Sequence, residues 1–477
     1  MSNQPIDTRR ASTSFPPGRP DGASLLSSSP LMRWSVLLIM AIVMMMGYVF
    51  WDIVSPLSTT LKAPVAAGGM SWTATEYGFY AGAYSIFNIF LLMLFIGGLI
   101  LDKFGIRLTG VLATGMMLGG ALINYYALAH ISPATSIEPA FTLFGLIPSP
   151  IKQQVLAASL GFGLFGVGCD MTGITVSKVI TKWFTGHELA SAMGIQVAMA
   201  RLGTAAAISF SPLIARTFGL SAPLWAGAVI LLIGFALFLV YLIIDRRFDA
   251  RKAQIAQVKA ATAHDGEPES EQFSFADFKK VLLNRGFWLI VVLCVLFYSS
   301  LRPFLKFATD LLINKYGMDS ITAGWVTSIL PYGTIALTPL FGHLFDRYGR
   351  GSRLMLIGCL LVTAGHLLLA LPIAGATWLA ATVMVLLGIS YSLVPSALWP
   401  SVPGMVPLKQ LGTAYSIIYY IQNIGLMLVP IGIGHVIDHH TDARGIVDFT
   451  MPTLIFAAFG AGASAVAYLL MRKEAKK

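Results

Sequence analysis

Twelve long apolar segments constrain the fold of this chain more than any other feature. Each holds at least about 20 residues, and a helix of that length rises about 30 Å, the thickness of the hydrocarbon core of a bilayer. No run of alternating short segments typical of a membrane barrel is found. The sequence therefore predicts an all-α membrane protein, with spans at roughly 34–61, 76–101, 107–129, 153–181, 189–215, 221–244, 287–314, 321–345, 353–372, 376–402, 411–437 and 450–471.

The composition excludes most other classes of protein. Of the 477 residues 56% are hydrophobic and only 11% are charged, whereas soluble proteins carry about 25% charged residues. So few charges could not cover a soluble fold, which excludes a soluble enzyme, a nucleic-acid binder and a disulfide scaffold. The three cysteines lie far apart in apolar stretches without metal-ligand spacing, so we expect buried thiols, no metal and no cofactor: Cys169, Cys294 and Cys359.

The distribution of basic residues predicts the topology. An even number of spans puts both termini on one side of the membrane. If that side is the cytoplasm, the cytoplasmic segments hold 24 of the 32 lysines and arginines, as the positive-inside rule requires. The basic residues on the cytoplasmic side of the bilayer account for the net charge of +10, so a nucleic-acid partner is not needed to explain it.

One long hydrophilic stretch, 245–285, divides the spans into two sets of six. We therefore predict a disordered cytoplasmic tail at 1–32, a six-helix bundle at 33–244, a partly helical cytoplasmic linker at 245–285, a second six-helix bundle at 286–472, and a short tail at 473–477.

Two sequence repeats relate the predicted bundles. The loop after the second span and the loop after the eighth share Gly, Asp and Gly at an offset of 244 residues. A second match, at an offset of 222, joins Glu188, Arg201 and Gly203 to Gln410, Asn423 and Gly425. Two offsets in the same order indicate a duplicated unit. The loop residues are Gly98, Asp102, Gly105 and Arg107, then Gly342, Asp346, Gly349 and Arg350.

The repeated loops are predicted to act as a conformational latch. Gly98 would let neighbouring helices approach closely, Asp102 would accept hydrogen bonds from a helix N-terminus or a basic side chain, and Gly105 would permit a tight reversal. Such a latch holds one conformation until substrate shifts the balance. The alternative is a generic polar turn.

On these motifs the chain resembles the major facilitator superfamily over most of its length. Five stretches are closer to the lysosomal dipeptide-transporter branch and its prokaryotic relatives: Trp183–Leu189, Met199–Gly203, Ala397–Pro400, Gln410–Tyr415 and Ile421–Gly425. The resemblance implies two pseudo-symmetric bundles of six helices and facilitated transport of dipeptides.

Two ionisable residues are predicted inside the membrane, where charges are costly and usually functional. Arg201 and Asp170 each lie about 18–20 Å from the cytoplasmic end of their spans. The resemblance implies an acid at Asp170, where the family has glutamate, and an arginine at Arg201. Arginine can grip the carboxylate of a dipeptide in a bidentate manner, and the acid can meet its ammonium group. Alternatively, the two side chains pair with each other.

Further polar and aromatic residues are candidates for the same cavity. The repeat maps Asp170 to Ser392 and Arg201 to Asn423, which we expect to bond the peptide amide or to join helices. Arg302 is predicted to line the outer half of the cavity or to form a salt-bridged gate, and Trp399 to form part of its wall.

Two further acids lie near predicted span ends. Asp52 is equally compatible with gating and with plain placement at the interface. Glu76 is predicted to be a helix N-terminal charge.

These observations predict a secondary transporter of small zwitterionic or anionic solutes, with dipeptides as the leading substrate. No histidine occupies a relay position, so uniport is favoured over proton symport. The alternatives are a carrier of organic anions or sugar acids, and a channel or non-transporting sensor; an enzyme is not expected.

We expect a monomer and leave an accessory subunit open. The tail segment Asp21–Leu26 fits an acidic dileucine signal, so the predicted location is a lysosomal membrane, or the inner membrane of a bacterium.

Overall fold

The computed structural model describes residues 30–184, 188–260, 283–349, 351–373, 375–406, 411–442 and 445–474. The tail signal Asp21–Leu26, residues 261–282 of the predicted linker, and Arg350 lie outside the described residues. The described chain is almost entirely helical, with one short antiparallel pair of strands, β1 (Ser136–Ile137) and β2 (Ile151–Lys152). The predicted all-α membrane fold is therefore confirmed.

The first half of the molecule packs mainly through α5 against α6 and α8, and α1 against α7 and α8. Its helices are α1 (Pro30–Asp52), η2 (Ser55–Leu57), α2 (Ser58–Lys62), η3 (Val65–Ala67), α3 (Ala74–Ala83), α4 (Ile86–Phe90), α5 (Met93–His130), α6 (Gln153–Phe184), α7 (Leu189–Phe218) and α8 (Ala222–Ala260). Helix α8 continues past the predicted bundle boundary at 244.

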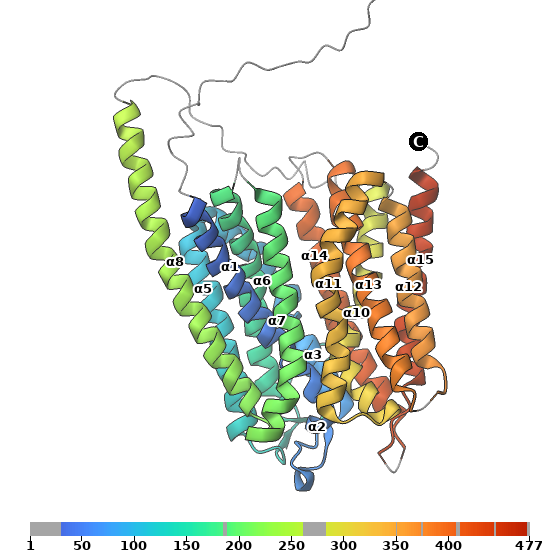
Figure 1. Ribbon diagram of the computed structural model, residues 1–477. Coiled ribbons are helices and arrows are strands. Elements are labelled where there is room, and N and C mark those ends of the chain that lie inside the picture. Colours follow the sequence, from blue (N-terminus) through green and yellow to red (C-terminus); the bar gives the residue numbers. More distant parts are fainter. Residues whose placement is uncertain are drawn as a thin grey trace, which may run out of the picture.

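The second half packs mainly through α12 against α15 and α13, and α11 against α13. Its helices are α10 (Arg285–Tyr316), α11 (Ser320–Tyr348), α12 (Gly351–Ala370), α13 (Thr377–Ser401), η4 (Val402–Gly404), α14 (Leu411–His439) and α15 (Thr450–Glu474). Helix α1 begins and α15 ends at the same end of the molecule (Figure 1). We call this the terminal end.

Ten helices in the described ranges are long and apolar enough to cross a membrane, and two predicted spans differ from them. The segment 76–101 is not one helix, because α3 stops at Ala83, α4 is short, and Leu92 has a left-handed backbone with φ of 51°. Local bonds such as Ile89 N–H to Ser85 O keep the interrupted backbone paired. Helix α11 has 29 residues, but Pro331, Pro339 and its hydroxyl residues lower its hydropathy.

The two halves contact each other closely at the end opposite the termini. There α3 of the first half crosses α14 of the second, and α7 crosses α11 (Figure 1). The α3–α14 contact is made by glycines: a Cβ on Gly78 would lie 2.3 Å from the Pro430 carbonyl oxygen, and one on Gly434 would lie 2.2 Å from that of Ala74. Only glycine permits this approach, so the backbones of the two halves lie in direct contact here. We call this end the sealed end.

Capping residues explain several helix starts. Thr73 and Glu76 form a capping box at α3, which confirms the predicted helix N-terminal role of Glu76, and Lys152 adds an ion pair at 3.1 Å. The side chain of Asn284 caps α10 and that of Asp319 caps α11 by accepting from backbone N–H groups of the first turn. These side chains accept from N–H groups that have no partner within the helix.

The first repeated loop lies at the terminal end and joins several helices. Gly105 has φ of 77° and breaks the helical geometry inside α5, a backbone conformation that favours glycine. Asp102 accepts from Lys178 of α6 at 2.7 Å, and Arg107 bonds Asp245 of α8 at 2.8 Å.

The close helix approach predicted at Gly98 is wrong for this conformation. A Cβ on Gly98 or Gly342 would meet no described atom within 4 Å. The neighbouring Gly97 makes the contact instead, since its Cβ would lie 2.7 Å from Met171. In the second loop Gly349 ends α11 with φ of 62°, while Asp346 is exposed.

Candidate functional site

The first candidate residue, Asp170 of α6, is held by the interrupted helix next to it. Its Oδ1 accepts from the Tyr84 hydroxyl at 2.7 Å and its Oδ2 from the Asn88 amide at 2.6 Å. Both donors lie where α3 gives way to α4, so the break in the predicted span places them toward the acid. Among the described residues no ion pair joins Asp170 to Arg201, so the predicted alternative of mutual pairing is not observed in this conformation.

Arg201 of α7 reaches across to the second half instead. One guanidinium nitrogen donates to the hydroxyl of Tyr391 at 2.6 Å, and the guanidinium carbon lies 4.3 Å from the centre of the same ring. A charge-assisted hydrogen bond and a cation–π contact therefore act together. Tyr391, in α13, is buried and joins the halves near the middle of the bundle.

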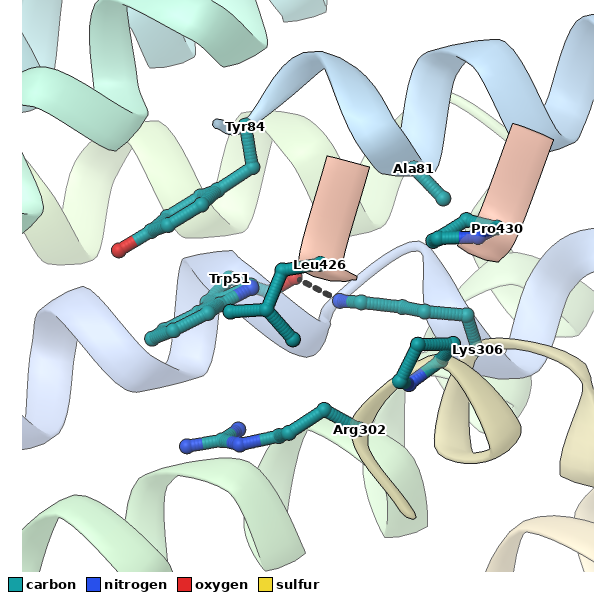
Figure 2. Close-up of a pocket in the computed structure, with 8 residues that line it drawn as sticks. Trp51, Ala81, Tyr84, Arg302, Lys306, Leu426 and Pro430 are labelled. Atoms are coloured by element: carbon teal, nitrogen blue, oxygen red, sulfur yellow. Dashed lines mark hydrogen bonds between the residues drawn. The ribbon is translucent and has the colours of Figure 1, made fainter. Parts of the chain in front are cut away.

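Arg302 of α10 makes the reciprocal crossing toward α1. Its guanidinium carbon lies 4.6 Å from the centre of the Trp51 ring, 5.6 Å from that of Tyr48 and 5.7 Å from that of Tyr391. Trp51 in turn stacks on Tyr84, with ring centres 4.1 Å apart and planes 6° from parallel. Figure 2 shows the Trp51 ring between Tyr84 and the Arg302 guanidinium. One stack thus leads from Arg302 to the tyrosine that bonds Asp170.

Lys306, one helical turn beyond Arg302, forms a buried ion pair with Asp52 of α1. Its ammonium group lies 2.7 Å from Asp52 Oδ1, 2.7 Å from the Trp51 carbonyl oxygen and 3.1 Å from Ser55 Oγ. Figure 2 shows the contact with the Trp51 carbonyl oxygen. Asp52 is 1% exposed and accepts from Thr204 through its other oxygen. Of the two predicted roles for Asp52, the buried contact between halves fits gating rather than placement at the membrane interface.

A small cavity lies between the halves. Two cations from the second half line it, and the described residues of its wall include no acid. Asp170 and Arg201 are outside the wall itself, but Asp170 bonds Tyr84, which is part of it. The lining residues are Trp51, Ala81, Tyr84, Arg302, Pro303, Lys306, Leu426 and Pro430 (Figure 2).

The remaining candidates take part in aromatic and amide contacts of the second half. The Trp399 indole donates to the Tyr298 hydroxyl at 3.2 Å and stacks on Tyr419 at 5.0 Å. Asn423 accepts from Ser85 of the first half at 2.6 Å. Ser392, the repeat equivalent of Asp170, donates to Gly388 O in its own helix and so presents no donor to the first half.

Sequence reasoning missed Tyr391 as the partner of Arg201. Its only sequence signal is a hydroxyl-bearing ring beside Ser392 in an apolar helix, which resembles ordinary core packing. Metal binding finds no support in the described ranges, where no group of three or more His, Cys, Asp or Glu residues is placed to hold an ion.

Comparison with known proteins assigns the family. The model of the Major Facilitator Superfamily matches residues 36–311 and 304–477, which together span nearly the whole chain. The chain therefore belongs to the Major Facilitator Superfamily, and it is a multi-pass membrane transporter of a small-molecule substrate. Its similar proteins are transporters and not enzymes.

Individual relatives indicate which solutes deserve a test. The chain is 28% identical to the lysosomal dipeptide transporter MFSD1 of Homo sapiens over 419 residues, covering 85% of this chain and 80% of the relative. It is 23% identical to the hexuronate transporter of Bacillus subtilis, covering 80% and 83%. A mutant of the nucleoside transporter NupG has the same fold, with a TM-score of 0.68 at 15% identity, over 91% of this chain and 99% of that structure.

Proposed function

We propose that this transporter carries dipeptides as a uniporter, by alternating access. The observation that carries the proposal is the arrangement of opposite charges at mid-height. Asp170 and Arg201 of the first half and Arg302 of the second are held by aromatic and polar partners rather than by one another. Such groups remain available to the two charged ends of a zwitterion.

Each group has a role suited to its chemistry. Asp170 meets the substrate ammonium, while Arg201 and Arg302 bind the carboxylate, for which the planar guanidinium is suited. Asn423 bonds the peptide amide, and Trp399 forms part of an apolar wall that tolerates many side chains. The 28% identity to MFSD1, a lysosomal dipeptide transporter by name, supports this substrate class.

The transport cycle follows from the seal between the halves. We place both termini in the cytoplasm, because the basic residues gather at that end, so the described conformation would open toward the cytoplasm. The bundles 33–244 and 286–472 would rock about the central cavity. Closure at the terminal end would engage the latch residues Gly98, Asp102, Gly105, Arg107, Gly342, Asp346, Gly349 and Arg350. The compartment would be a lysosomal or a bacterial inner membrane.

A second candidate is transport of sugar acids or other organic anions. Arg302 and Lys306 both line the cavity, and the hexuronate transporter of Bacillus subtilis is 23% identical. An anion without an ammonium group would use the cations and leave Asp170 unused.

Counterflow in proteoliposomes separates the candidates. We expect saturable exchange of a dipeptide with free ends and weak exchange of the same dipeptide after acetylation of its amino end. Uniport predicts that a proton gradient of either sign drives no accumulation. Exchange of glucuronate with none of any dipeptide would favour the anion carrier, and undiminished exchange of the acetylated dipeptide would remove the role of Asp170.

A further inference from the structure

Arg302 is a buried cation whose hydrogen-bond donors have no acceptor among the described residues. Its residue is 9% exposed, and within the described part of the chain its guanidinium donates no hydrogen bond. The nearest carboxylate oxygen, on Asp52, is 3.9 Å away, beyond hydrogen-bond distance. The five N–H groups of an arginine here border aromatic rings and the cavity that the side chain lines, so they can take an acceptor that enters the cavity.

The other two cations of the region already have hydrogen-bond partners. Lys306 directs its ammonium group at three oxygen atoms, between 2.7 and 3.1 Å away, so its three N–H donors are used. Arg201 uses one of its five N–H donors on the Tyr391 hydroxyl at 2.6 Å, and it is not part of the cavity wall, which Arg302 lines. An anion in the cavity therefore meets the donors of Arg302.

We propose that Arg302 is the residue that receives the substrate carboxylate, and that Lys306 is a positioning residue that binds no substrate. This inference rests on the proposed function and divides the roles of the two arginines. Lys306 holds Asp52 and the Trp51 carbonyl oxygen, so it fixes the ring on which Arg302 lies. The carboxylate then sits against Arg302, and the ammonium group points along the Trp51–Tyr84 stack toward Asp170.

The ring contacts suit this role because they hold the cation without using its donors. A guanidinium over the face of an indole is attracted by the π system, while its N–H groups point outward in its own plane. That geometry leaves a planar fork for bidentate binding of a carboxylate. Lysine has no such plane, so it cannot reproduce the arrangement.

The test compares alanyl-alanine with its C-terminal amide. Binding to the purified full chain is measured by thermal shift, and uptake by competition in counterflow. We expect the wild type to prefer the free carboxylate by roughly ten- to a hundred-fold, as a charge-assisted pair implies. Arg302→Gln should reduce the preference to about three-fold or less, and Arg302→Lys, which keeps the charge, should reduce it at least about five-fold.

Arg216→Gln is the matched control, since Arg216 is exposed in α7 and the same chemical change there should preserve the preference. Full preference in Arg302→Lys would overturn the assignment, even if Arg302→Gln does not fold. Loss of preference in Arg201→Gln with retention in Arg302→Gln would transfer the role to Arg201. Dipeptide exchange without any preference for a free carboxylate would refute this inference alone, whereas no dipeptide exchange would also refute the proposed function.

Discussion

At the scale of single residues, Asp52 organises the contact between α1 and α10. One of its oxygens accepts from Lys306 at 2.7 Å and the other from Thr204 at 2.9 Å. Desolvating two charges is costly, and only close geometry with further hydrogen bonds offsets that cost. The three acceptors around Lys306 meet this condition, so the pair is a fixed part of the interface between the halves.

Asp52→Asn should strongly destabilise the protein. The substitution leaves the Lys306 ammonium buried beside a neutral amide, and breaking a buried pair costs about 3–5 kcal/mol. Thermal unfolding of the purified protein should show a lower Tm. The double variant Asp52→Leu, Lys306→Met should recover much of the loss, since the Lys306 charge is removed together with its partner. A single variant as stable as the wild type would contradict the account.

Arg201→Ala should abolish transport at near-normal expression, and Arg201→Lys should recover little of it. Lysine can keep a positive charge near Tyr391, but it cannot stack a planar group on the ring while donating to the Tyr391 hydroxyl. For Arg201→Lys we expect a counterflow rate at least about ten-fold below that of the wild type, which corresponds to a loss of about 1.4 kcal/mol in the transition state. Wild-type rates in the lysine variant would refute this geometry.

The sequence identifies these charges but not their partners. Asp170 and Arg201 are conspicuous because charged residues are rare in apolar spans. Their partners Tyr84 and Tyr391 look like ordinary core aromatics. The contact between Asp52 and Lys306 joins residues 254 positions apart, and no local pattern sets the relative placement of two halves.

At the scale of elements, the crossing of α3 and α14 depends on glycine. Gly78, Gly82 and Gly434 each bring a backbone carbonyl of the other helix to within 2.5 Å of where a Cβ would be. In lipid, where apolar surface gives little drive for association, such close packing holds helices together. The sequence shows these glycines but not which face of each helix meets a neighbour. For the same reason the sequence predicted a close helix contact at Gly98, whereas Gly97 makes that contact, with Met171.

Gly434→Ala should weaken the sealed end, whereas Gly432→Ala should not. A Cβ at position 434 would overlap the Ala74 carbonyl oxygen, while one at 432, in the same helix, would meet no described atom within 4 Å. Overpacking costs about 1–3 kcal/mol, and here it would destabilise the conformation in which α3 and α14 are in contact. Slower counterflow in the first variant alone is expected. Equal rates in the two variants would show that the crossing is loose.

At the scale of the whole molecule, three carboxylates cross between the halves toward the sealed end. Asp52 of the first half accepts from Lys306, Asp310 of the second accepts from Lys62 and Thr59, and Asp438 of α14 accepts from the start of α3. The predicted charge asymmetry and duplication anticipated two bundles. Which end is closed could not be predicted, since one sequence serves every state of the cycle and only contacts distinguish them.

Asp438 offers the most direct test of this seal. Its carboxylate accepts from the backbone N–H groups of Ala74 and Thr75 at 2.8 and 2.7 Å, and from the Thr75 hydroxyl at 2.6 Å. A negative charge at a helix N-terminus is favourable, and this one belongs to the opposite half. Asp438→Asn removes the charge and one acceptor, at a cost of about 1–3 kcal/mol to the sealed conformation.

The population open at that end should rise by roughly ten-fold, the effect of about 1.4 kcal/mol. In a chain whose three cysteines are replaced by serine, Leu426→Cys places a thiol in the cavity wall, and an impermeant maleimide is added on the side opposite the termini. Labelling should accelerate in Asp438→Asn and stay unchanged in Asp319→Asn. Asp319 accepts only within its own helix, and asparagine caps as well as aspartate. Equal acceleration in both variants would mean that general loosening, and not loss of the bond between halves, admits the reagent.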